Sequence, residues 1–132
     1  MARFGLAYIH PSASADRRRG TQGRQPFLFI PAGVFGLLNE VRSYGVQVIA
    51  INEGLELELS KRFTIREWVC QHPADCYCLD IHWHEHLYGA MAVATIVKDC
   101  HPHSIVVVGG MTASFFGEEL LSLCPAIDVV VA

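Results

Sequence analysis

Three histidines in one short segment are the densest group of residues that could do chemistry. His82, His84 and His86 alternate with other residues, so a strand that continued through them would place all three imidazoles on one face. Imidazole is a ligand for zinc, iron or nickel, and Asp80 or Glu85 could add a carboxylate. If the chain bends within this segment, the histidines diverge and line a pocket without a metal. The spacing alone leaves both interpretations open.

A glycine-rich turn at residues 109–114 is the second candidate. Gly109 and Gly110 carry no Cβ, so the backbone there can approach a ligand closely, and Thr112 and Ser114 add hydroxyl groups. A helix beginning behind the turn favours an anionic group. The same glycines also suit a tight strand-to-helix turn without any ligand. The turn lacks the Gly-Lys-Ser/Thr sequence of a Walker A loop, and the chain has no Gly-x-Ser-x-Gly nucleophile elbow.

Alternating apolar and helical segments must position these two groups. We predict strands at residues 4–9, 46–51, 75–82, 105–108 and 127–131, and helices at residues 34–44, 64–71, 87–99 and 113–123. Gly45 should close the first helix in a left-handed conformation, and residues 52–61 should form an acidic connection. Thr64 and Glu67 form a capping box, and Thr112 or Ser114 is available to cap the last helix.

This order of elements predicts an α/β fold. Right-handed crossovers give a doubly wound, five-stranded parallel sheet, with the flavodoxin-like order 2-1-3-4-5 favoured. The carboxyl ends of its strands bring together the loops at residues 10–24, 83–88 and 109–114, where ligands of such sheets bind. The last helix is missing, because the sequence stops on an apolar strand. We therefore expect residues 1–132 to be one domain, either the N-terminal piece of a longer protein or a chain covered by another subunit.

Composition and charge exclude several classes of protein. The chain has 132 residues, of which 52% are apolar and 17% charged, which excludes a disordered chain. Residues 1–25 hold five arginines and one aspartate, but the net charge of the whole chain is −3, so a general nucleic-acid surface is not expected. The stretch from Arg17 to Arg24 is either an anion-binding loop or a solvated one.

The apolar segments and the cysteines bear on the cellular setting. No segment approaches the roughly 20 apolar residues of a membrane span, and no signal peptide precedes the first strand, so we expect a cytoplasmic protein. The five cysteines form an odd set without a Cys-x-x-Cys, which argues against a disulfide framework. We expect them mainly as small buried hydrophobes, including Cys76 and Cys78, which share one face of the third strand.

Four stretches of the chain resemble a known family. These are Tyr8-Ile9-His10-Pro11 after the first strand, Ile30-Pro31-Ala32-Gly33-Val34-Phe35-Gly36-Leu37, Leu79-Asp80-Ile81-His82-Trp83, and Val108-Gly109-Gly110-Met111-Thr112-Ala113-Ser114-Phe115-Phe116. Together they are similar to the N-terminal cobalamin (vitamin B12)-binding domain of cobalamin-dependent radical SAM proteins. The last stretch is the most specific, since the Gly-Gly turn of that family lies against the nucleotide tail of the corrinoid.

The resemblance implies a corrinoid at the carboxyl edge of the sheet. The tail would run toward Gly109 and Gly110 near the hydroxyls of Thr112 and Ser114, and the corrin would rest over the loop that contains His82, Trp83 and His84. His10 and Asp80, at the ends of the first and third strands, complete the implied cofactor-binding set. No cobalt ligand is assigned, because His10-Pro11-Ser12-Ala13 stands in place of an Asp-x-His-x-x-Gly motif.

The resemblance also implies a division of labour. In intact members of the family a following barrel domain binds a 4Fe-4S cluster and S-adenosylmethionine and performs radical chemistry, often methylation. None of the five cysteines here has the Cys-x-x-x-Cys-x-x-Cys spacing of that cluster. The chain would therefore carry the cofactor and depend on that barrel, or on a second subunit, for the reaction. The alternative function is a metal-binding protein or metal-dependent enzyme that uses His82, His84 and His86.

Overall fold

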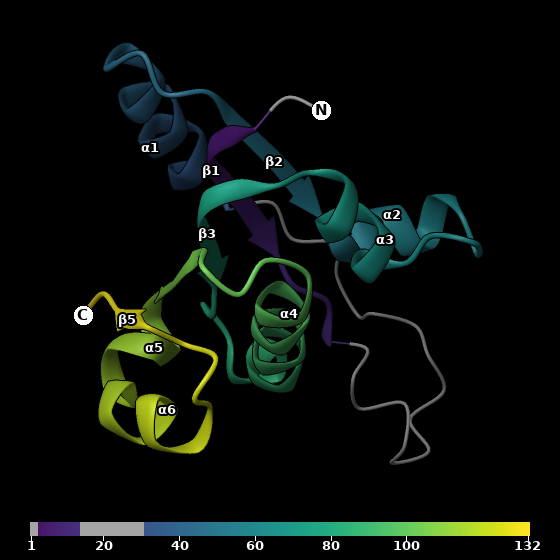
Figure 1. The fold of residues 1–132 in the computed structure, drawn as a ribbon. Coiled ribbons are helices and arrows are strands. Elements are labelled where there is room, and N and C mark those ends of the chain that lie inside the picture. Colours follow the sequence, from purple (N-terminus) through teal and green to yellow (C-terminus); the bar gives the residue numbers. More distant parts are fainter. Residues whose placement is uncertain (1–2, 14–30) are drawn as a thin grey trace.

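A five-stranded, wholly parallel sheet organises the chain (Figure 1). The computed structural model describes residues 3–13 and 31–132. The strands run in the order β2-β1-β3-β4-β5, as predicted, and their bounds are β1 Phe4–His10, β2 Val48–Asn52, β3 Ala74–Asp80, β4 Ile105–Gly109 and β5 Val129–Val130. The order confirms the flavodoxin-like doubly wound fold class.

Six helices and one 3-10 turn connect the strands within the described residues. Their bounds are α1 Ala32–Ser43, α2 Glu53–Leu59, α3 Ile65–Gln71, the 3-10 turn His84–His86, α4 Leu87–Cys100, α5 Met111–Phe115 and α6 Gly117–Leu123. Gly45 follows α1 with a φ of +80°, which confirms its left-handed conformation. The Thr64 hydroxyl accepts a hydrogen bond from the Glu67 amide at 3.3 Å, so Thr64 caps α3 as expected. No described helix is long and apolar enough to cross a membrane.

The two faces of the sheet differ in how they are covered. We call one the covered face; its central side chains are fully or almost fully buried and pack with α3, α4 and α6 in a single core, comprising Ala7, Ile9, Tyr77, Leu79, Val106 and Val108. Successive side chains of a strand point to opposite faces, so the alternate residues form a second surface. We call it the open face; it comprises Leu6, Tyr8, His10, Val48, Ala50, Asn52, Cys76, Cys78, Asp80, Ile105, Val107 and Gly109.

Helix α1 is the one described helix on the open face. Its residues Val34, Phe35 and Leu38 line a cavity of about 160 Å³ together with Tyr8 and Ala50 of the sheet. Only Leu38 of this helix is buried. The centre of the open face therefore holds side chains that are only half-buried, and Ile105 at its far end is 50% exposed.

Several elements differ from the prediction. The acidic stretch after β2 is helical, because the side chain of Asn52 accepts a hydrogen bond from the Leu55 amide and starts α2. The alternation of Glu and Leu in that stretch hid the helical period. The last predicted helix is divided at Phe116 into α5 and α6, and Gly110 precedes it in place of a Thr112 or Ser114 cap. The fifth strand is shortened to Val129–Val130.

The cysteine prediction is wrong for one pair. Cys70 of α3 and Cys100 of α4 form a disulfide with a Cα–Cα distance of 5.4 Å. Their separation of 30 residues gave no motif, and only the packing of α3 against α4 brings them together. Cys124 is buried as expected, whereas Cys76 and Cys78 are half-buried on the open face rather than core residues.

Residues 14–30 lie outside the described part of the chain. The predicted polar loop at residues 10–24 falls largely on them, and so does the proposed anion-binding stretch from Arg17 to Arg24. Those two expectations remain predictions.

The disulfide yields a prediction about stability. Replacing Cys70 and Cys100 together by Ser should lower the free energy of unfolding by about 3–4 kcal/mol, because the bond closes a loop of 30 residues in the unfolded chain. Urea unfolding followed by circular dichroism measures the change. Adding a reductant should weaken the parent protein similarly and leave the double variant unchanged; equal unfolding midpoints for parent and variant would contradict the bond.

Candidate functional site

The open face ends, at its carboxyl edge, in a row of residues from four adjacent strands. The backbone register pairs Asn52 of β2 with His10 of β1, and Asp80 of β3 with Gly109 of β4. A contact of 3.1 Å between His10 Nδ1 and Asp80 Oδ2 joins the two halves of the row. This row, Asn52–His10–Asp80–Gly109, lies where ligands of open parallel sheets bind.

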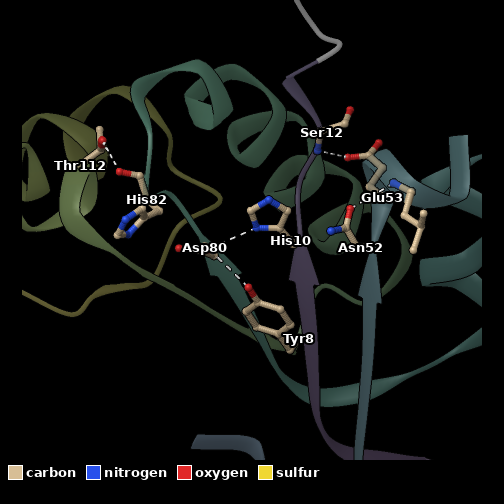
Figure 2. A network of polar contacts seen from close by, with 9 residues as sticks. Tyr8, His10, Ser12, Asn52, Glu53, Asp80, His82 and Thr112 are labelled. Atoms are coloured by element: carbon tan, nitrogen blue, oxygen red, sulfur yellow. Dashed lines mark hydrogen bonds and ion pairs between the residues drawn. The ribbon is translucent and has the colours of Figure 1, made fainter. Parts of the chain in front are cut away.

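The His10–Asp80 contact is shielded from solvent. The two residues are only 4% and 8% exposed, so the carboxylate and the imidazole meet where water screens them little. The Tyr8 hydroxyl donates a second hydrogen bond to Asp80 Oδ2 at 3.4 Å (Figure 2). Burial, followed by the charge of Asp80, raises the pKa of Tyr8, so the phenol keeps its proton and acts as a donor. The three side chains thus fix the ends of β1 and β3 relative to each other.

A second buried carboxyl lies beside this row. Glu53 begins α2, and its Oε2 accepts a hydrogen bond from the Ser12 amide at 2.7 Å (Figure 2). Burial raises the pKa of Glu53, although the hydrogen bond from Ser12 and the proximity of His10 oppose the shift. Glu53 therefore holds the chain just after β1 in place. Glu53 and Tyr8 were not predicted as site residues; the position of Glu53, two residues beyond the predicted strand at residues 46–51, was the available signal.

The histidine segment does not form the predicted row of imidazoles. Strand β3 ends at Asp80, and residues 84–86 turn as a 3-10 helix, so the condition for three imidazoles on one face is not met. His82 is half-buried, His84 is exposed and His86 is buried. Among the described residues, no group of three or more His, Cys, Asp or Glu side chains is placed to hold a metal ion.

His86 turns inward instead and meets the His10–Asp80 pair. The rings of His86 and His10 lie 4.8 Å apart, and within the described residues His86 Nδ1 is buried without a hydrogen-bond partner. Burial, and then the neighbouring His10, lowers the pKa of His86, since a positive charge there would be poorly solvated. The buried cluster therefore holds a neutral imidazole next to the row.

The glycine turn packs against the segment that follows β3. Gly110 has a φ of +106°, and a Cβ built on it would lie 2.7 Å from Asp80 Oδ1 and 2.8 Å from the carbonyl carbon of Ile81. The Thr112 amide donates to the Ile81 carbonyl, and the Thr112 hydroxyl donates to the His82 carbonyl at 3.1 Å. The Ser114 hydroxyl donates to the Gly110 carbonyl. Both hydroxyls thus donate to the backbone, and the Thr112 hydroxyl joins the two loops.

Unlike Gly110, Gly109 has space around it for a Cβ atom. A Cβ at Gly109 would meet only the Val131 side chain, at 4.0 Å. The two glycines therefore have separate reasons to be glycine: Gly110 allows a close approach within the protein, whereas Gly109 leaves space at the end of the row.

Large apolar side chains surround this edge. Trp83 and Tyr88 after β3, and Met111, Phe115 and Phe116 after β4, are each between 44% and 76% exposed. The hydrogen bond from the Thr112 hydroxyl to the His82 carbonyl brings the two segments together (Figure 2). An edge with this much exposed aromatic surface is typical of a binding surface. No family model matches the chain, and no curated protein matches it.

The glycine turn gives a direct test of the packing. Gly110→Ala should lower the free energy of unfolding by more than about 1 kcal/mol, because the methyl group meets Ile81 and Asp80 and the backbone has a positive φ. Gly109→Ala, the matched control, should change it by less, because the added Cβ has room. Thermal unfolding of both variants measures the difference; a Gly109 variant as weak as the Gly110 variant would contradict this account.

The buried imidazole gives a pH prediction. The folded-state pKa of His86 lies below its usual value of 6.5, so its contribution to stability is present above that pH and is lost as the pH falls through the folded pKa. His86→Phe should therefore lose less stability than the parent on going from pH 7.5 to pH 5. Urea unfolding at both pH values measures this, and replacing the exposed His103 by Phe is the control. An equal loss in parent and His86→Phe would contradict it.

Proposed function

We propose that the chain binds a corrinoid, cobalamin, at the carboxyl edge of its sheet. The observation that carries the proposal is the open space at Gly109, which ends a row of polar side chains on the open face. The resemblance to the cobalamin-binding domains of radical SAM proteins supports it, because the glycines of that family lie against the nucleotide tail. The flavodoxin-like sheet provides the carboxyl edge at which the resemblance implies that the corrinoid binds.

The residues present fit such a ligand in two respects. The exposed rings of Trp83, Tyr88 and Phe116 offer apolar surface for a broad macrocycle, and burying apolar surface favours binding by about 25 cal/mol for each Å². The row Asn52–His10–Asp80–Gly109 offers polar side chains and space beside this surface. A bound cobalamin would supply cobalt–carbon bond chemistry.

The roles of the implied residues follow from their contacts. His10 would hold the end of β1 through Asp80 rather than bind cobalt, because its ring is buried and its Nδ1 contacts the carboxylate. Thr112 would keep the loop of His82, Trp83 and His84 against the start of α5. Ser114 would steady the turn at Gly110. In this proposal the chain's residues position the cofactor and exclude water from its tail.

The radical reaction itself would take place on a partner domain or subunit. The 4Fe-4S cluster and S-adenosylmethionine of a radical SAM barrel would be bound by a further domain or a second subunit, and methyl transfer would need both parts. Nothing among the described contacts favours the alternative of a metal site at His82, His84 and His86. A cytoplasmic location belongs to the same proposal.

Mixing the protein with hydroxocobalamin tests the proposal. The corrinoid spectrum should remain with the protein through gel filtration. Gly109→Phe should reduce the retained corrinoid at least tenfold, because the ring occupies the space at the end of the row; thermal unfolding checks that the variant is folded.

Replacing Thr95 by Phe on the exposed side of α4 is the matched control and should retain the corrinoid. Complete loss of colour from the parent protein would overturn the proposal. Stoichiometric zinc or iron in the purified protein without corrinoid binding would favour the metal-binding alternative instead.

A further inference from the structure

Two thiols lie side by side on the open face. Cys76 and Cys78 are two residues apart on β3, so both point to the same side of the sheet. Their sulfur atoms are 3.9 Å apart, and both side chains are half-buried, so a solute can reach them. The proposed corrinoid site makes no use of either residue.

We propose that Cys76 and Cys78 form a two-thiolate site for a monovalent soft metal ion, with Cu(I) as the type case. The strand holds the two sulfurs at a separation that one ion can bridge. Metal–sulfur bonds of about 2.3 Å to both atoms would span 3.9 Å at an angle of about 116°. Opening the angle toward a straight line moves the sulfurs apart by less than about 1 Å, on the same bond length.

The number of ligating side chains near the two thiols determines which metal ion fits. Structural zinc takes four ligands, whereas the described residues offer no third His, Cys, Asp or Glu side chain grouped for a metal. Thiolates bind both zinc and Cu(I), and of these two ions Cu(I) is the one that does not require four ligands. A pair of thiols without further ligands therefore points to a soft ion that accepts two of them.

The surroundings suit an ion of low charge. Leu6 and Ile105 flank Cys76 in the sheet register, and Tyr8 and Val107 flank Cys78. Two thiolates with one monovalent cation leave a net charge of −1, which is cheaper in a half-buried apolar place than two separate thiolates.

Nearby charges do not compete for the ion. The carboxylates whose negative charges act on Cys76 are Asp128 and Asp75. Arg3 pairs with Asp75, and Lys98 pairs with Asp128 at 2.6 Å. The carboxylates are also harder ligands than the two sulfurs.

Binding is an exchange of protons for the metal ion. Two S–H bonds break, two metal–sulfur bonds form, and two protons pass to solvent; no electron is transferred. Binding should accordingly weaken as the pH falls.

An anaerobic titration with Cu(I) tests the site. The Cys70–Cys100 disulfide is kept oxidised, so that those sulfurs do not compete. The protein should bind one Cu(I) per chain and develop thiolate-to-metal absorption in the ultraviolet. Cys76→Ser and Cys78→Ser should each lower the affinity at least tenfold, as measured by competition with a Cu(I) chelator.

Cys124→Ala is the matched control, because it removes the remaining free thiol and should leave the titration unchanged. Circular dichroism confirms that each variant is folded. Retained stoichiometric binding in the Cys76→Ser/Cys78→Ser double variant would overturn the proposal, and so would the absence of binding by the folded parent. Neither result depends on whether the protein retains hydroxocobalamin.

Discussion

The buried contact between His10 and Asp80 is the interaction on which the arrangement of the site depends. It joins the carboxyl ends of β1 and β3, the two strands at which the chain reverses direction across the sheet. A crevice opens at such a point because the helices on either side leave in opposite directions. Removing either partner would take one hydrogen-bond partner from a buried polar group, which costs more than the contact itself contributes. The loops at this edge are therefore positioned by buried polar contacts as well as by apolar packing.

The contrast between the two faces follows from the same topology. The crossovers after β2, β3 and β4 place their helices on the covered face, where the core residues are almost entirely buried. The crossover after β1 places α1 on the open face. Both proposed sites lie on the open face, one at its carboxyl edge and one at its centre, because it is there that side chains of the sheet remain accessible.

Much of the fold could be predicted from the sequence, since apolar runs and helix caps are local signals. The strand order, the cap at Thr64 and the left-handed Gly45 are confirmed. Helix α2 was missed because its Leu and Glu residues alternate with period two, and the disulfide was missed because only tertiary packing brings Cys70 and Cys100 together. At the site, Gly109 was named from the Gly-Gly turn, and His10 and Asp80 were named through the family resemblance. Tyr8 and the inward turn of His86 could not be found, because both depend on contacts between distant segments.

Helix α1 buries a single side chain, Leu38, over its twelve residues. Burying one leucine contributes roughly 1.5–3 kcal/mol, whereas the helices of the covered face share a continuous core. Local opening begins where the fewest apolar contacts must be given up. Helix α1, which covers the cavity over Tyr8 and Ala50, can thus detach locally while the sheet stays intact. Bulky ligands could enter the open face there without the protein unfolding.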